Sequence, residues 1–211
     1  MKSIIEFEDV SFCYENDYPL FEKLNLVIEE KELIGIMGSS GCGKTTFLHI
    51  LAGLVHPSSG IVKFKDLSLY DLTSHKRDRI IREHFSFIFS SPFLIKEISI
   101  QENLSLTHSS STFSKKEKEL IELFDLYPLL NHYPHQLSSG QQQRVCILRG
   151  LIKKSEFILA DEPTAHLDKK RSYQVMDLLT EYLKEQGRGL ICVTHDLHLE
   201  SFFDRVHNFS E

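Results

Sequence analysis

The sequence predicts an α/β fold with a mainly parallel sheet, an antiparallel β subdomain and a helical subdomain. Three observations lead to this prediction. Short apolar runs typical of buried strands alternate with helical patterns, which is the order found around parallel sheets. Two segments near the N-terminus alternate apolar and polar residues, as half-buried antiparallel strands do. One apolar run leads directly into a glycine-rich loop that is followed by a helix.

The composition is that of one globular unit. The chain has 211 residues, of which 41% are hydrophobic, so it can bury one substantial core, and we expect a single domain over residues 1–211. The net charge is −6, from 24 basic and 30 acidic residues. Proteins that bind nucleic acid commonly carry a strong basic field, so no nucleic-acid partner is expected.

The sequence pattern contains neither a secretory signal nor a membrane span. Acidic residues stand where a signal would have its apolar core, and no apolar run approaches the roughly 20 residues of a span. We therefore expect a soluble, cytosolic chain. Because they lack C-x-x-C spacing, four cysteines are expected to be reduced thiols, namely Cys13, Cys42, Cys146 and Cys192.

The N-terminal third predicts strands on both sides of the glycine-rich loop. The run Leu33–Met37 is apolar throughout and predicts a buried strand before the loop. Behind the loop, apolar residues from Phe47 to Leu54 recur at helical spacing. Antiparallel strands are expected at residues 4–10 and 24–28, and a strand at 61–64 is expected to return after a turn at 57–60 in a hairpin-like excursion.

The remaining chain predicts a helical region between buried strands. Residues 92–150 show helical periodicity without strand alternation, which predicts a helical subdomain. Inside it, Ser114 and Glu117 form a capping-box pattern ahead of an apolar helical stripe. The other expected elements are a surface helix at 75–83, buried strands at 85–89, 157–162 and 190–194, and an amphipathic helix at 169–186.

The glycine-rich loop matches the phosphate-loop pattern G-x-x-x-x-G-K-[ST] without a mismatch. Its glycines let backbone N–H groups turn toward phosphate oxygens at the positive end of a helix dipole. The alternative, a chance glycine-rich turn, is disfavoured because a strand and a helix flank the loop as the motif requires. The predicted nucleoside-triphosphate site comprises Gly38, Ser39, Ser40, Gly41, Cys42, Gly43, Lys44, Thr45 and Thr46.

Three residues of this loop have distinct expected roles. Lys44 would place its ammonium group on the β- and γ-phosphates. Thr45 would offer its hydroxyl to Mg²⁺, which neutralises charge as the γ-phosphoryl group departs. Thr46 is expected to pack against its surroundings or to cap the helix.

Two carboxylates follow a later apolar strand. Asp161 suits a water-mediated contact with Mg²⁺, while Glu162 could orient or deprotonate the attacking water. Pro163 then stops the strand from continuing. The alternative is a solvated acidic turn, which the upstream phosphate loop and the spacing of an α/β core disfavour.

Two ring-bearing residues each allow two interpretations. Tyr14 could stack its ring on an adenine face, but an aromatic residue packed at a strand end is the alternative. His195 ends a predicted core strand, where it could contact a γ-phosphate or serve as an ordinary structural histidine. From the residues alone the structural interpretation is favoured for both.

A further stretch places serines and a glycine at the start of a predicted helix. Exposed N–H groups and hydroxyls at such a start form an anion site. An ordinary serine N-cap is the alternative, and without further context it is favoured. The candidate anion-binding residues are Ser138, Ser139, Gly140 and Gln141.

These pieces, in this order and spacing, resemble the nucleotide-binding subunit of ATP-binding cassette (ABC) transporters over essentially the whole chain. The resemblance makes Tyr14 the adenine-stacking aromatic residue and His195 the switch histidine. It implies that ATP and Mg²⁺ are bound. The family motifs correspond to residues 38–46 for the Walker A loop, 137–141 for the signature, 157–162 for the Walker B strand and 165–168 for the D-loop.

The resemblance also implies partners. Two such subunits pair head to tail, so each ATP lies between one Walker A loop and the other subunit's Ser138, Ser139 and Gly140. The dimer would form with itself or with a paralogue, and the transmembrane transporter subunits would be separate chains. The protein would then be peripheral on the inner face of the cell membrane. Its compact length and the run from Phe47 to Leu54 look most like the branch serving lipoprotein-releasing, macrolide-export and cell-division complexes.

Three residues depart from the family pattern. Ser139 replaces the first glycine of the signature pair, and its hydroxymethyl group could restrict backbone approach at a helix-start anion site. His166 occupies a D-loop position usually taken by a small or amide residue. Ser90 stands where the family has a glutamine that reaches the Mg²⁺ shell, so it is at best a weak metal contact.

Two other functions compete with a transporter ATPase. A regulatory or scaffolding cassette would bind ATP and dimerise with little turnover, as Ser90 hints, but Glu162 and His195 argue against it. A soluble cassette ATPase acting on DNA or ribosomes would be expected to have a tandem or coiled-coil-bearing chain and a more basic surface. The sequence therefore predicts an ATP-binding and ATP-hydrolysing subunit that energises a membrane transporter.

Overall fold

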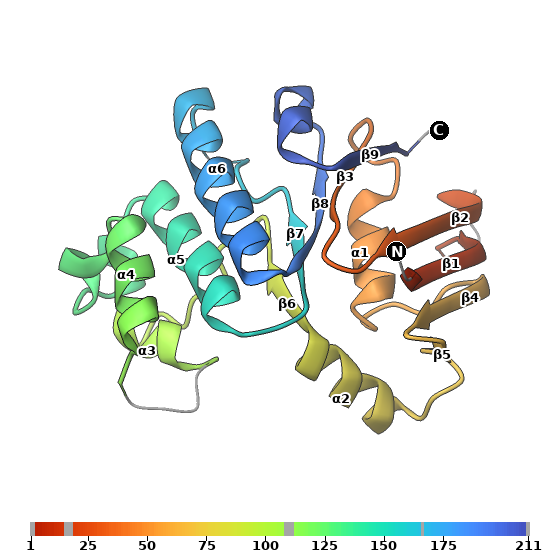
Figure 1. The fold of residues 1–211 in the computed structure, drawn as a ribbon, viewed down its shortest axis with the longest axis horizontal. Coiled ribbons are helices and arrows are strands. Elements are labelled where there is room, and N and C mark those ends of the chain that lie inside the picture. The colour runs from red at the N-terminus through yellow and green to blue at the C-terminus, as the bar shows by residue number, and fades with distance from the viewer. Residues whose placement is uncertain (1–2, 15–18, 108–111, 166, 210–211) are drawn as a thin grey trace.

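The computed structural model describes residues 3–14, 19–107, 112–165 and 167–209, which form two sheets with helices around them (Figure 1). One sheet has four strands in the order β2-β1-β4-β5, and each neighbouring pair is antiparallel. The strands of this sheet are β1 (Ser3–Phe12), β2 (Phe21–Glu29), β4 (Ser59–Phe64) and β5 (Leu67–Ser68).

The other sheet has five strands in the order β6-β7-β8-β3-β9, and all neighbours run parallel. The prediction of a parallel sheet beside an antiparallel one is therefore confirmed. The strands are β3 (Leu33–Met37), β6 (Phe85–Ile88), β7 (Phe157–Asp161), β8 (Gly189–Thr194) and β9 (Arg205–Asn208).

The helices cover both faces of the parallel sheet. Helix α1 lies between the two sheets, while α5 and α6 lie on the opposite side of the parallel sheet (Figure 1). The α-helices are α1 (Lys44–Leu51), α2 (Ser74–His84), α3 (Ile100–Ser105), α4 (Lys115–Leu123), α5 (Ser139–Ile152) and α6 (Lys169–Gln186). Short 3-10 helices span Tyr127–Leu129, Pro134–Gln136 and Leu197–Phe202.

Alternation along the central strands divides the core in two. In β7, Leu159 faces the cluster that contains α1, whereas Ile158 and Ala160 face the cluster beneath α5 and α6. Such a strand is buried on both faces, which explains why it is apolar throughout. Phe47 of α1 joins the two sheets, since its ring lies 4.7 Å from that of Phe7 in β1.

Several expected boundaries shift by a residue or two. The predicted strand at 85–89 ends at Ile88, and the strand expected at 157–162 ends at Asp161 because Glu162 has a left-handed φ of 45°. Strand β4 begins inside the turn expected at 57–60 and pairs with β1. The short edge strand β9 was not predicted.

The structure contains the capping box that the sequence predicts at the start of α4, and a glycine ends α6. Ser114 accepts a hydrogen bond from the Glu117 amide, and the Glu117 carboxylate accepts one from the Ser114 amide. Helix α6 ends at Gly187, whose φ of 62° closes the helix in the left-handed conformation. Within the described ranges, no helix is long and apolar enough to cross a membrane.

Candidate active site

Three neighbouring strands deliver the candidate residues to one edge of the parallel sheet. Strands β3 and β7 both pair with β8, in parallel, so their carboxyl ends lie together. Met37, directly before the phosphate loop, is in register with Thr194, and Asp161 is in register with Val193. Ligands of open parallel sheets bind at this edge, where the strands' carboxyl ends meet.

The phosphate loop turns around its lysine. The Lys44 side chain is buried, and its Nζ atom donates hydrogen bonds to the Gly38 carbonyl at 2.9 Å and the Ser39 carbonyl at 2.7 Å. Gly43, the N-cap of α1, has a φ of 101°, and a Cβ there would meet Leu20 and Phe21 at 3.0 Å. The loop therefore needs glycine at this position for its backbone and for its packing.

Thr45 and Asp161 meet although 116 residues separate them. The Thr45 hydroxyl donates to Asp161 Oδ1 at 3.0 Å. Burial raises the pKa of the Asp161 carboxyl above its ordinary value, and the Thr45 hydrogen bond opposes that rise. A hydroxyl and a carboxylate are the oxygen donors that Mg²⁺ takes beside substrate phosphates, so the pair fits this ion.

Glu162 has partners on both of its carboxylate oxygens. Oε1 accepts hydrogen bonds from the His195 amide at 3.0 Å and from His195 Nδ1 at 2.6 Å. Oε2 accepts from the Thr194 hydroxyl at 3.0 Å. The structure therefore places the predicted base next to the predicted switch histidine. Both carboxylate oxygens of Glu162 accept hydrogen bonds from protein groups.

Thr194 is a residue that sequence reasoning missed. Its side chain is buried at the end of β8, and its hydroxyl both donates to Glu162 and accepts from the Asp196 amide at 3.1 Å. The available signal was its position directly before His195, on the last residue of a predicted strand. Threonine is common in strands because it is β-branched, so its type alone did not predict a hydrogen bond to Glu162.

Tyr14 lies beside the start of α1. Its hydroxyl is 3.2 Å from the Thr46 hydroxyl, and its ring meets Phe12 edge-on at 4.8 Å between centroids. Thr46 is buried, which agrees with the packing role expected for it. About half of the Tyr14 side chain is exposed, so a face of the ring remains available for stacking.

The signature residues form the start of α5. The Ser138 hydroxyl accepts a hydrogen bond from the Gln141 amide, and Gln141 Oε1 accepts one from the Ser138 amide, which completes a capping box. Ser138 and Ser139 are exposed. Within one subunit these residues therefore act as an ordinary helix N-cap, and both serines remain exposed to solvent.

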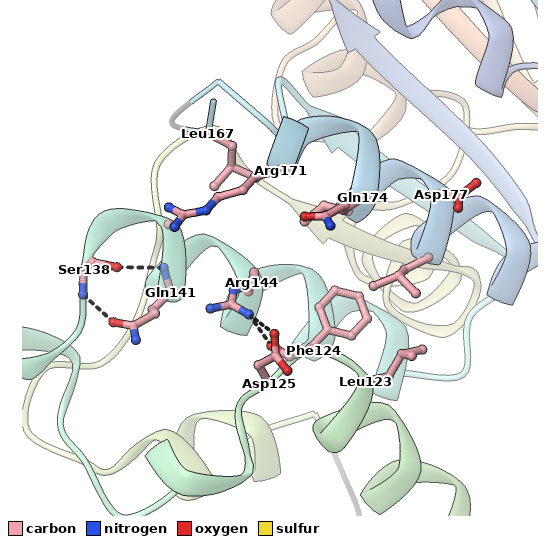
Figure 2. A pocket seen from close by; sticks show the side chains of 13 residues that line it. Leu123, Phe124, Asp125, Ser138, Gln141, Arg144, Leu167, Arg171, Gln174 and Asp177 are labelled. Atoms are coloured by element: carbon pink, nitrogen blue, oxygen red, sulfur yellow. Dashed lines mark hydrogen bonds and ion pairs between the residues drawn. The ribbon is translucent and has the colours of Figure 1, made fainter. Parts of the chain in front are cut away.

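A pocket of about 520 Å³ lies between α4, α5 and α6 (Figure 2). It begins beside Ser138 and Gln141, and Arg144 and Arg171 extend into it. None of its lining residues belongs to the phosphate loop or to the strand ends that carry the carboxylates. The pocket is therefore separate from the triphosphate site.

Two residues that depart from the family pattern take different places. Ser90 is partly buried just beyond the end of β6, the edge strand that pairs with β7. The position of His166 lies outside the described residues.

The fold and the site define a phosphate-loop nucleotide-binding protein, with a cradled lysine, a hydroxyl and carboxylate pair, and a held glutamate. A family model described as ABC transporter matches residues 21–165, more than half of the chain. The chain therefore belongs to the ABC transporter family, as its motifs predicted.

Relatives and a solved structure agree with this family. An uncharacterized ABC transporter ATP-binding protein of Methanocaldococcus jannaschii is 42% identical, with 88% of this chain and 84% of the relative covered. The lipoprotein-releasing system ATP-binding protein LolD of Hydrogenovibrio crunogenus is 37% identical, with 92% and 86% covered. A dimeric post-hydrolysis state of the ATP-binding cassette MJ0796, bound to ADP and Pi, is 32% identical with a TM-score of 0.84, with 97% and 94% covered.

These findings establish the biochemical class. The chain is an ATP-binding and ATP-hydrolysing subunit that energises an ABC transporter, so the ATPase and transporter predictions are confirmed.

Cys42 offers a chemical test of the loop. Cys42 is buried, and its Sγ atom lies 3.7 Å from Lys44 Nζ, so a bound nucleotide that contacts Lys44 would also lie close to the thiol. Burial raises the pKa of Cys146 to about 11 and that of Cys192 well above its ordinary value, which keeps both thiols unreactive. In a Cys13→Ser variant, MgATP should slow alkylation of Cys42 at least about tenfold, as measured by mass spectrometry. Equal rates with and without MgATP would place the nucleotide elsewhere.

Proposed function

We propose that the residues at the sheet edge divide the work of ATP hydrolysis. The phosphate loop and Lys44 bind the β- and γ-phosphates, exchanging the loop carbonyls now held by Nζ for phosphate oxygens. Tyr14 stacks on adenine through its exposed ring face. Thr45 and Asp161 hold Mg²⁺, which when bound neutralises charge on the transferring phosphoryl group.

Glu162 acts on the attacking water. This proposal rests on the position of the Glu162 carboxylate. Thr194 and His195 hold it by hydrogen bonds, directly after Asp161, which accepts from Thr45. Before Glu162 can accept a proton from water, its Oε1 atom must lose the hydrogen bond to the His195 ring. The His195 side chain is 63% exposed, so it can rotate into solvent. A γ-phosphate is the anion that attracts the His195 ring, so ATP binding and release of the base are linked.

The signature residues serve the partner subunit. Because the hydroxyls of Ser138 and Ser139 are exposed at the start of α5, they are available to a nucleotide held by a second copy or a paralogue. The solved relative is itself a dimer. The chain is then a peripheral protein on the inner face of the cell membrane, bound to separate transmembrane subunits, in the branch to which LolD belongs.

The partner is identified by co-purification. The tagged protein is extracted with a mild detergent from membranes of cells that express it at its natural level, and the captured chains are identified by mass spectrometry. We expect a polytopic transmembrane subunit in defined stoichiometry. Capture of DNA-bound or ribosomal proteins in place of a transmembrane subunit would support a soluble cassette instead.

Ser90 predicts a weakened metal contact. With its short side chain, Ser90 would contact a bound Mg²⁺ only through an added water, which can cost up to about 2 kcal/mol in ordering. We expect Ser90→Gln to lower the Mg²⁺ concentration for half-maximal hydrolysis severalfold and to increase stimulation by the reconstituted membrane subunit. Ser91→Gln, at the exposed neighbouring position, is the matched control. Unchanged values for Ser90→Gln, or lower activity, would show that this loop is built differently.

A further inference from the structure

Gln143 is a buried polar residue to which neither its sequence pattern nor the proposed chemistry gives a role. It lies on α5, two residues beyond Gln141, and its side chain is fully buried. Its Nε2 atom donates one hydrogen bond to the Phe89 carbonyl at 3.2 Å and another to the Pro163 carbonyl at 3.0 Å. One amide group therefore joins three separate segments of the chain.

The two carbonyls belong to the residues that flank the active site. Phe89 directly precedes Ser90, and Pro163 directly follows Glu162. The two peptide segments leave the neighbouring parallel strands β6 and β7 at the same sheet edge. Gln143 thus spans the gap between the Ser90 loop and the Glu162 turn, from the helix that carries the signature residues.

The helix that holds Gln143 is itself fixed against β6. Gly150 lies two turns further along α5 on the same face, and a Cβ there would meet the Ile88 side chain at 3.0 Å. This close approach seats the C-terminal half of the helix on the strand that leads to Phe89. The Gln143 amide is therefore presented from a rigid support.

The stability that Gln143 provides comes from its two N–H donors and not from its acceptor. Gln143 Oε1 is buried, and among the described residues no group donates to it. A buried acceptor without a partner destabilises a fold, and an apolar side chain of the same shape would avoid that penalty. What an apolar side chain lacks is the pair of N–H donors that Phe89 and Pro163 use.

We propose that Gln143 is a positioning residue for ATP hydrolysis, holding the Ser90 loop and the Glu162 turn at a fixed separation from the signature helix. The inference rests on the proposed role of Glu162. That residue has a left-handed φ of 45°, a conformation that persists only where neighbouring contacts hold it. Without the hydrogen bond from Gln143 to Pro163, the backbone at Glu162 relaxes. The Glu162 carboxylate then moves away from the position in which it contacts the attacking water.

The expected kinetic consequence is specific. Gln143 donates to Phe89 and Pro163, whereas Lys44 of the phosphate loop donates to Gly38 and Ser39, so the KM for ATP should stay within about twofold. The kcat should fall at least about tenfold, because a shift of about 1 Å in a catalytic group can cost roughly 10²-fold. A purely structural role would lower the amount of folded enzyme, which reduces the maximal rate at an unchanged KM, so kcat is calculated per mole of enzyme that binds ATP. A purely structural role leaves this corrected kcat at the wild-type value.

The test compares two glutamines that are adjacent in α5. Gln142 Nε2 also donates to two carbonyls, those of Pro134 at 2.9 Å and of Leu137, the first residue of the signature stretch, at 3.2 Å. Neither carbonyl belongs to the Ser90 loop or to the Glu162 turn. Gln143→Met and Gln142→Met remove the same donors and keep a similar shape. ATP hydrolysis is measured as a function of MgATP, with thermal unfolding followed in parallel. We expect the loss of kcat in Gln143→Met and a kcat within about twofold of wild type in Gln142→Met.

Further variants keep the test decisive. Gln143→Leu also lacks both donors and places no charge in the buried site, so it carries the measurement if the methionine variant does not fold, and it should lose kcat to a similar extent. Wild-type kcat in either folded Gln143 variant, or an equal loss in Gln142→Met, would overturn the inference. Glu162→Gln is measured alongside, because a fully active Glu162→Gln enzyme would refute the proposed base while leaving the Gln143 result to be read separately.

Discussion

Replacing Glu162 by glutamine is expected to lower ATP hydrolysis by about 10²-fold or more while ATP binding is retained. A glutamine keeps the shape of the side chain, and its carbonyl oxygen still accepts from His195. Its amide group takes the place of the oxygen that now accepts from the Thr194 hydroxyl. The substitution therefore deletes the proton acceptor with little change in packing, and the nucleotide contacts of Lys44 and Thr45 stay intact.

The closed dimer should accumulate in this variant, because ATP binding joins the subunits and hydrolysis separates them. Steady-state hydrolysis, nucleotide binding and the gel-filtration mass with ATP are measured together. Glu83→Gln is the matched control, since Glu83 is an exposed residue on α2 that forms an ion pair with Arg79, far from the strand ends that carry the site. An active, monomeric Glu162→Gln protein would remove Glu162 from its proposed role.

Ser139→Arg is expected to abolish hydrolysis without unfolding the subunit. Ser139 is the first residue of α5 and its side chain is exposed, so a longer side chain meets no internal neighbour. In a head-to-tail dimer, however, the arginine would occupy the space in which the partner's ATP meets the signature helix. Ser74→Arg is a matched control, because Ser74 is likewise an exposed serine that begins a helix, α2.

Mixing two inactive variants tests whether the site is shared. Ser139→Arg has an intact phosphate loop, and Lys44→Ala has an intact signature. In a mixed dimer, the intact phosphate loop of the Ser139→Arg subunit faces the intact signature of the Lys44→Ala subunit. One functional site is therefore formed, and hydrolysis should reappear in the mixture. Wild-type activity per subunit should also rise with protein concentration around the dimer affinity. A mixture that stays inactive, together with flat activity across concentration, would contradict a shared site.

The local features of this site were within reach of the sequence. A phosphate loop is a continuous strand, loop and helix, so the pattern from Gly38 to Thr46 contains most of the geometry that it forms. The capping boxes at Ser114 and Ser138 are equally local, because each involves residues only three positions apart. The apolar runs of β3, β7 and β8 follow from burial on both faces of a parallel sheet.

Strand order, in contrast, is a long-range property. The sequence placed Glu162 and His195 at the ends of two strands, but only the pairing of β7 with β8 brings the carboxylate within hydrogen-bond distance of the ring and of Thr194. The edge strand β9 escaped prediction because it is four residues long and partly exposed, so it shows no clear alternation.

The sequence alone determined the phosphate loop, the family and the identity of the residues that carry charge to the site, because these depend on residue types at fixed short spacings. The tertiary structure alone decided which of those residues meet, that Thr194 holds Glu162, and that Gln143 lies across the Ser90 loop and the Glu162 turn. A glutamine inside a helical pattern reads as a surface residue, since polar side chains are mostly exposed. Only the packing of α5 against the ends of β6 and β7 buries this one and gives its two donors their partners.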